Sequence, residues 1–341
     1  MRRIILALAA ATLLAPSPAE PATTLILGRP THRSITVNAC PDTALELYVE
    51  YGRTSGVYPG RTPAVNAAAN EPVELLIDDL VANSRYYYRL RYRRAQSGGD
   101  FLAEAEHSFH TQRARGAAFT FGVQGDSHPE RENNMFHPDL YRRTLDAVAA
   151  DRPDFYLTSG DDFSVDTLRT WTNDTVAGRY TLQVPYLARV GHSTPLFLVN
   201  GNHEQAARYL LDGTPNNVAV WAQNARNLYY AQPGPDDFYS GNAEVVEHIG
   251  LLRNYYAWEW GDALFVVLDP FGNTVQNPNS NPQDNWRWTL GRTQYDWLKR
   301  TLEGSRAKYK FLFLHHLVGG VASARGGIET RSEEHTSELQ S

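Results

Sequence analysis

The chain has 341 residues, a formal net charge of −6 and a single cysteine, Cys40. One cysteine excludes an internal disulfide framework, so the stability of the fold must come from a sizeable hydrophobic core. The mildly acidic charge argues against nonspecific surface binding to nucleic acid or anionic membrane, and the length fits two domains better than one.

The N-terminus has the pattern of an export signal. Two arginines at positions 2 and 3 precede an apolar run over 4–15, which is followed by the small residues Ser17, Pro18 and Ala19. We therefore predict a signal peptide over 1–19 and a secreted or periplasmic protein. The apolar run is shorter than the roughly 20 residues that cross a bilayer, and no later run approaches that length, so we expect no membrane span.

Residues 23–113 are predicted to form an all-β sandwich, because short runs of alternating apolar and polar residues are separated by turn residues. Residues 112–116 are the expected hinge to the next domain. The predicted strands cover 34–38, 44–51, 72–77, 86–92 and 105–110.

A tyrosine in this region gives a more specific signal. Leu80 is followed six residues later by Tyr86 in the string L-V-A-N-S-R-Y-Y-Y-R-L, which resembles the signature of fibronectin type III domains. The resemblance implies that the Tyr86 hydroxyl bonds to nearby backbone at a corner of the sandwich. Such a fold by itself implies no chemistry.

Residues 117–330 alternate between strand and helix patterns, which indicates an α/β domain. A hairpin is expected from the apolar runs 255–260 and 263–268 around Gly261-Asp262. The later helix, 293–302, would turn either Tyr295 or Trp297 and Leu298 toward the core. Strands are predicted over 118–123, 155–158, 196–199 and 310–314, with a helix over 140–150.

A short polar cluster follows each of these four strands: G-D-S-H at 125–128, G-D-D at 160–162, G-N-H-E at 201–204 and H-H at 315–316. Carboxylate, amide and imidazole groups are ligands of divalent and transition metals. In α/β folds, ligands bind beyond the carboxyl ends of the strands, where all four clusters fall. Four clusters in this context predict a metal centre far more strongly than one would.

The segment between the third and fourth clusters is rich in aromatic residues. These could stack on a substrate, or they could pack the segment onto the domain, which is the more usual role of large aromatics. The proline- and asparagine-rich stretch 277–285 is expected to be an exposed loop. The aromatic residues concerned are Trp221, Tyr229, Tyr230, Phe238, Tyr239, Trp286 and Trp288.

The last eleven residues, R-S-E-E-H-T-S-E-L-Q-S at 331–341, change composition abruptly. They resemble an in-frame translation of a short-read sequencing adapter, so we interpret the authentic sequence as ending near Thr330. A natural disordered tail is the alternative. On the adapter interpretation, His335 is not a candidate ligand.

The motif order D-x-H, G-D, G-N-H-E, H resembles the calcineurin-like metallophosphoesterase superfamily, which includes the purple acid phosphatases. The match covers about 119–320. It implies two mixed sheets flanked by helices and a hydrolase of small phosphorylated substrates, with two Fe, Zn or Mn ions and a metal-bridging hydroxide as nucleophile. The superfamily's last motif, G-H-x-H, is missing from the sequence, so we expect weak metal binding and impaired hydrolysis by this chain.

The resemblance also assigns roles to individual residues. Asp161 would bridge the two ions, and His203 would stabilise the transition state or protonate the leaving group. Asp162, Glu204 and His316 are expected around the site without binding metal. The implied ligands are Asp126 and His128 for the first ion, Asn202 and His315 for the second.

One position departs from the superfamily pattern. Three residues after Asp161 the chain has Ser164, where purple acid phosphatases have a tyrosine that ligates ferric iron and other branches have an aspartate that orients the catalytic histidine. A serine argues against an Fe(III) requirement, because no phenolate is available there. Another group, with Asp162 and Asp166 as candidates, would then have to hold His203, or the histidine would be less well tuned.

Several alternatives remain open from the sequence. Asp126 and Asp161 could be turn or helix-capping residues, and Asn202 could simply occupy a left-handed turn. Strand alternation allows only one of the two histidines, His315 or His316, to face the site, and the resemblance favours His315. At the level of function, the alternative to an enzyme is an exported binding or adhesion module with a noncatalytic remnant of the α/β domain.

Overall fold

The computed structural model describes residues 21–132, 134–274 and 289–316. The predicted signal peptide, the stretch 277–285, Trp286, Trp288 and the final eleven residues lie outside the described residues. Within them, no helix combines the length and apolar character that crossing a bilayer would require.

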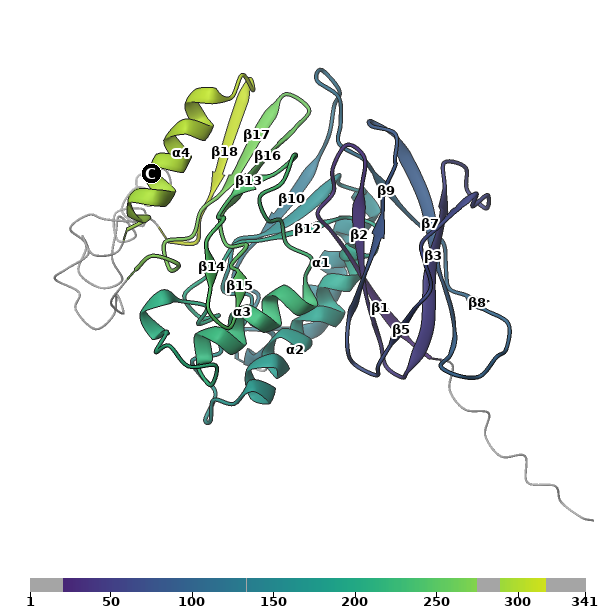
Figure 1. Ribbon diagram of the computed structural model, residues 1–341, viewed down its shortest axis with the longest axis horizontal. Helices are drawn as coiled ribbons and strands as arrows, with labels where there is room; N and C mark the ends of the chain where they lie inside the picture. Colours follow the sequence, from purple (N-terminus) through teal and green to yellow (C-terminus); the bar gives the residue numbers. More distant parts are fainter. Residues whose placement is uncertain (1–20, 133, 275–288, 317–341) are drawn as a thin grey trace, which may run out of the picture.

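The N-terminal domain is a sandwich of two sheets (Figure 1). One sheet has the order β1-β2-β6, and the other has the order β4-β3-β7-β8, with β5 pairing β3 and β9 pairing β7. Every pairing is antiparallel. The strands are β1 (Thr23–Gly28), β2 (Ile35–Pro41), β3 (Leu45–Gly52), β4 (Gly60–Arg61), β5 (Val65–Ala67), β6 (Val73–Ile77), β7 (Arg85–Arg94), β8 (Leu102–Ala103) and β9 (His107–His110).

The sandwich core confirms the sequence pattern. Alternate residues of β7, among them Tyr86, Tyr88 and Leu90, are buried against the opposite sheet. The Tyr86 hydroxyl accepts a hydrogen bond from the backbone N–H of Val81 at 2.9 Å, and Leu80 is buried beside it. This is the corner contact that the fibronectin type III resemblance predicts, and the N-terminal domain is fibronectin type III-like.

The second domain has four layers (Figure 1). The first three α-helices cover one face of the parallel sheet β10-β11-β12, whose other face packs on the mixed sheet β13-β16-β17-β18. Helix α4 covers the far face of the mixed sheet. The helices are α1 (Pro138–Asp151), α2 (Asn173–Gly191), α3 (Val218–Tyr229) and α4 (Gly291–Gly304). The strands are β10 (Phe121–Gln124), β11 (Phe155–Thr158), β12 (Leu196–Leu198), β13 (Ser240–Gly241), β16 (Tyr256–Trp260), β17 (Ala263–Val267) and β18 (Tyr309–Phe313). A separate ribbon is formed by β14 (Val245–Val246) and β15 (Gly250–Leu251), and two short 3-10 helices are η1 (Pro129–Arg131) and η2 (Arg208–Leu210).

Burial on both faces explains why the central strands are apolar throughout. In β11, Phe155 and Leu157 face the second sheet, whereas Tyr156 faces the helices. On α4, Trp297 is buried and Tyr295 is 54% exposed, which resolves the alternative left open by the sequence. The hairpin of β16 and β17 forms as predicted.

The aromatic segment after the third cluster packs into the domain. Tyr229, Tyr230 and Tyr239 are buried, and Trp221 packs against the core formed by the parallel sheet and its helices. Phe238 packs partly buried against the core between the two sheets. Among the aromatic residues that the structure describes, packing is therefore the role that the contacts support.

The two domains share a packed boundary. Ile26 of β1 belongs to the core beneath α2, and the Tyr88 hydroxyl donates a hydrogen bond to the carbonyl of His192, just after α2, at 2.6 Å. Asn38 donates from its amide to the carbonyl of Leu228 at 2.9 Å. The segment 112–116, predicted as a hinge, is tied to the second domain by the bond from the Gln112 amide to the carbonyl of Glu259, at 2.8 Å.

Replacing Tyr86 by phenylalanine tests the corner contact. The ring stays, but the Val81 N–H loses its acceptor, so we expect the free energy of unfolding to fall by about 1 kcal/mol in urea titrations. Tyr87→Phe is the matched control, because Tyr87 lies on the opposite face of the same strand. Equal stability losses in the two variants would contradict the assignment.

Candidate metal centre

The four polar clusters lie at one edge of the paired sheets. Strands β10, β11 and β12 run parallel, and β18 runs parallel to β17 in the second sheet. The loops after β10 and β11 are joined by a hydrogen bond from the Asp126 N–H to the carbonyl of Gly160 at 3.2 Å. The loop after β18 joins them through the His315 Nδ1, which lies 2.9 Å from the carbonyl of Ser159.

Three predicted ligands converge at this edge. Asp126, Asp161 and His315 each offer a ligand atom, and these atoms all lie within 4.8 Å of one another. Asp161 is buried, whereas Asp126 is exposed. Carboxylate oxygens with an imidazole nitrogen suit Zn, Mn or Fe. These three residues come from three separate loops. Together their side chains form a donor set that fits a metal ion.

Asp161 and His315 form a close ion pair. The His315 Nε2 lies 3.1 Å from the Asp161 Oδ2. Burial alone would lower the pKa of His315, but the contact with Asp161 outweighs it and raises that pKa to about 9. Burial likewise opposes ionisation of Asp161, yet His315 holds the pKa of that carboxyl below its usual value. A metal ion that binds here must replace the proton on His315.

Backbone conformation at these loops is strained. Asp126, His128 and Asp161 have φ values of 50°, 44° and 52°, in the left-handed region that non-glycine residues rarely occupy. Strain of this kind persists only where surrounding contacts impose it, and it is concentrated at functional sites. The sequence left open a left-handed turn at Asn202. That conformation is instead found at three other candidate ligands, Asp126, His128 and Asp161.

His128 is buried and held by two partners. Its Nδ1 lies 3.0 Å from the Glu130 Oε1 and 3.2 Å from the Ser164 hydroxyl. A proton on Nδ1, shared with the Glu130 carboxylate, leaves Nε2 as the free acceptor that a metal requires. Glu130 was missed by the sequence analysis, although it stands only two residues after His128.

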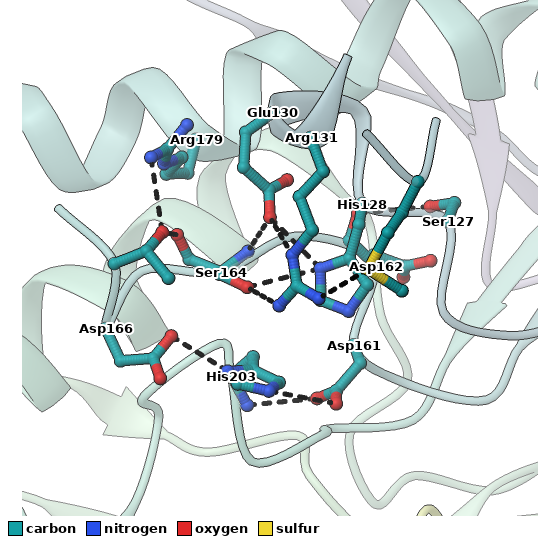
Figure 2. A network of polar contacts seen from close by, with 12 residues as sticks. Ser127, His128, Glu130, Arg131, Asp161, Asp162, Ser164, Asp166, Arg179 and His203 are labelled. Atoms are coloured by element: carbon teal, nitrogen blue, oxygen red, sulfur yellow. Dashed lines mark hydrogen bonds and ion pairs between the residues drawn. The ribbon is translucent and has the colours of Figure 1, made fainter. Parts of the chain in front are cut away.

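His203 is oriented by Asp166, not by Asp162. Its Nδ1 lies 2.8 Å from the Asp166 Oδ1, and its Nε2 lies 3.8 Å from the Asp161 Oδ2 (Figure 2). The hydrogen bond that His203 donates to Asp166 raises the pKa of His203 despite partial burial. The His203 ring stands edge-on to that of His128, with 5.4 Å between the ring centres. Asp166 therefore contacts His203, although the chain has a serine at position 164, where other branches of the superfamily have the orienting aspartate.

Glu204 and Asp162 lie inside the loops. The Glu204 Oε1 accepts from the Asp162 N–H at 2.7 Å, and its Oε2 accepts from the Gly201 N–H at 2.8 Å. Burial, reinforced by Asp161, raises the pKa of Glu204 well above its usual value. Burial also raises the pKa of Asp162 to about 6, despite its contact with Gln124. The Glu204 side chain therefore joins the loops after β11 and β12, and the Asp162 side chain contacts Gln124 at the end of β10.

Asn202 and His316 are the two remaining candidates. Asn202 is half-buried, and its carbonyl accepts a hydrogen bond from the Gln205 side chain at 2.7 Å. The ring of His316 lies 4.4 Å from that of His315 and 5.9 Å from that of Phe271. His315 contacts Asp161, with 3.1 Å between its Nε2 and the Asp161 Oδ2.

The close approach of two loops makes Gly201 difficult to replace. A Cβ at Gly201 would lie 2.2 Å from the Asp161 Oδ1 and 2.3 Å from the Asp161 backbone nitrogen. We expect Gly201→Ala to reduce the free energy of unfolding by roughly 1 to 3 kcal/mol in urea titrations, because the backbone has to move. Gly178→Ala in α2, where a Cβ meets nothing within 4 Å, should stabilise the protein by up to about 1 kcal/mol. Similar effects of the two substitutions would contradict this geometry.

The contact with Asp166 should raise the pKa of His203. We expect Asp166→Asn to lower the pKa of His203 in the metal-free protein, as measured by NMR titration of the imidazole. Because the folded pKa is raised, the stability from this pair is complete below the unfolded pKa of about 6.5 and is lost as the pH rises through the folded value. Asp174→Asn, in the first turn of α2 and outside this cluster, is the control. A His203 titration that D166N leaves unmoved would exclude Asp166 as its partner.

Comparisons with known proteins agree with this architecture. The sequence profile of the calcineurin-like phosphoesterase family matches residues 119–340. Among solved structures, PhoD is similar with a TM-score of 0.61 and 16% identity, covering 85% of this chain and 61% of that one. A purple acid phosphatase from yellow lupin (Lupinus luteus) seeds is similar with a TM-score of 0.58 and 16% identity, covering 89% and 52%.

The chain therefore spans between half and two thirds of the length of these two structures. A search of curated proteins found no match. The matched range begins just before β10 and includes all four polar clusters. The chain belongs to the calcineurin-like phosphoesterase family.

Proposed function

We propose that this protein is an exported, metal-dependent hydrolase of phosphate esters that works with two metal ions. The observation that carries the proposal is the convergence of Asp126, Asp161 and His315 within 4.8 Å, with His203 beside Asp161. Export rests on the signal peptide predicted over 1–19. The family fold supports phosphoester chemistry, and the donor atoms support metal binding.

The ligands divide into two groups around Asp161. Asp126 and His128 would hold one ion and Asn202 and His315 the other, with Asp161 shared between them. The position of Asp161, in contact with His315 and within reach of Asp126, supports this shared role. Two divalent ions would neutralise the phosphate and lower the pKa of an attacking water.

His203 would act on the leaving group. The Asp166 Oδ1 accepts a hydrogen bond from the His203 Nδ1–H, and the raised pKa keeps the imidazole protonated at higher pH than an isolated histidine. A protonated Nε2 can stabilise developing negative charge or give its proton to the departing alkoxide. The backbone N–H of His203 also donates a hydrogen bond to the Asp161 Oδ1 at 2.9 Å. This bond fixes the histidine relative to the shared carboxylate.

Metal binding tests the assignment of Asp161. In equilibrium dialysis against Mn²⁺ or Zn²⁺ supplied in excess, we expect the full chain to bind metal. Asp161→Asn, which preserves shape and the acceptor for the His203 N–H, should weaken binding at least about 100-fold, since loss of even an outer partner costs 10- to 100-fold. Hydrolysis of p-nitrophenyl phosphate should fall with it.

The control is Asp139→Asn, which removes an exposed carboxylate paired with Arg142 on α1. Equal metal affinity in the two variants would contradict the role of Asp161. A wild-type chain that binds no metal would favour the alternative function, an exported binding module with a noncatalytic α/β domain.

A further inference from the structure

Arg131 has a position that the metal-ligand assignment does not explain. It ends η1, the short 3-10 helix that begins immediately after His128. Its Nη2 donates to the Ser164 hydroxyl at 2.8 Å, and that same hydroxyl lies 3.2 Å from the Nδ1 of His128. One buried serine therefore connects the guanidinium to a candidate metal ligand, at the position where the family relatives described above have tyrosine or aspartate.

Glu130 contacts all three residues of this arrangement, Ser164, His128 and Arg131. Its side chain is only 4% exposed, and its Oε1 accepts from the Ser164 N–H at 3.0 Å, contacts the His128 Nδ1 and lies 3.5 Å from the Arg131 Nε. The buried Glu130 carboxyl thus contacts both the ligand and the arginine.

The outer end of Arg131 remains accessible. The side chain is 25% exposed, and its Nη1 contacts the sulfur of Met135 at 3.5 Å. Each terminal nitrogen of a guanidinium carries two hydrogens, so these contacts leave donors for another oxygen. In Figure 2 the side chain extends from η1 toward Ser164, with His203 below it in this view.

A chain of contacts connects Arg131 to the neighbourhood of His203. The Arg131 Nη2 donates to the Ser164 hydroxyl, that hydroxyl contacts the Nδ1 of His128, and the ring of His128 stands edge-on to that of His203 with 5.4 Å between the ring centres. Asp161 and Asp166 both contact His203. A fixed guanidinium nearby adds to the positive charge that two bound metal ions would present to a phosphate anion.

We propose that Arg131 binds a nonbridging oxygen of the substrate's phosphoryl group and thereby favours phosphate monoesters over diesters. The inference rests on the proposed function and names the substrate class of the same site. A monoester carries close to two negative charges at neutral pH, because its second pKa is about 6, whereas a diester carries one. The forked donors of arginine match two nonbridging phosphate oxygens, and a monoester has one more such oxygen and more negative charge on them than a diester.

The experiment uses the full chain loaded with Mn²⁺ and inorganic phosphate as the probe. We expect Arg131→Gln to weaken phosphate binding about 10- to 100-fold in calorimetric titration, with Mn²⁺ affinity unchanged. Hydrolysis of p-nitrophenyl phosphate should fall by more than that of bis(p-nitrophenyl) phosphate. Arg131→Lys, which keeps the charge and loses the fork, should lie between wild type and R131Q.

Arg179→Gln is the matched control. Arg179 lies on α2 and its Nη2 approaches the Thr167 hydroxyl at 3.5 Å, on the far side of Ser164 from His203 in Figure 2. We expect it to leave phosphate affinity unchanged.

Two outcomes would overturn the inference while leaving the proposed function standing. One is equal phosphate affinity in wild type and R131Q. The other is loss of Mn²⁺ binding in R131K as well as in R131Q, which would make Arg131 a support for His128 alone. Failure of the wild-type chain to bind Mn²⁺ would instead overturn the proposed function and, with it, this inference.

Discussion

The site depends on the contact between Asp161 and His315, because this contact joins the two sheets at their common edge. Asp161 follows β11 in the parallel sheet, and His315 follows β18 in the mixed sheet. Aromatic side chains of β11, β16 and β17 fill the space between the sheets and set their separation. The candidate metal centre is therefore a property of how two layers pack, and not of any one loop.

Buried carboxylates give the loops their shape. Glu204 binds the N–H groups of Asp162 and Gly201, and so connects the loops after β11 and β12. Glu130 does the same between η1 and the segment that contains Ser164. Each of these carboxylates satisfies backbone donors that would otherwise be buried without partners. The strained conformations of Asp126, His128 and Asp161 are held by such contacts.

The two domains pack through specific contacts. The sandwich contacts α2 and the residues just after it through Ile26, Tyr88 and the ring of His107, which lies 4.4 Å from that of His192. Helix α2 in turn packs on the parallel sheet whose strands end at the site. The sandwich thus supports the layer behind the candidate metal centre, and none of the contacts described for the site comes from a sandwich residue.

Sequence patterns alone predicted the β-sandwich with its Tyr86 corner, the strands that precede each polar cluster, and the family. These features depend on local alternation and on motifs in which neighbouring residues carry the signal. Helix α2 was not predicted, because Gly178 and Pro185 lower its helix propensity and its cap is Thr172 with Thr175, not the usual glutamate or glutamine. Helix α3 was also not predicted, because the two valines in its first turn lower its helix propensity.

Which carboxylate contacts each histidine is evident only from the folded structure. Asp162 and Asp166 are equally acceptable partners of His203 in the sequence, but the chain direction after Asp161 turns Asp162 inward toward Gln124 and leaves Asp166 beside the imidazole. Glu130 and Arg131 carry no motif, and their roles come from contacts with Ser164, more than thirty residues away. Hydrogen bonds between loops depend on where the strands end in space, and local sequence does not encode that position.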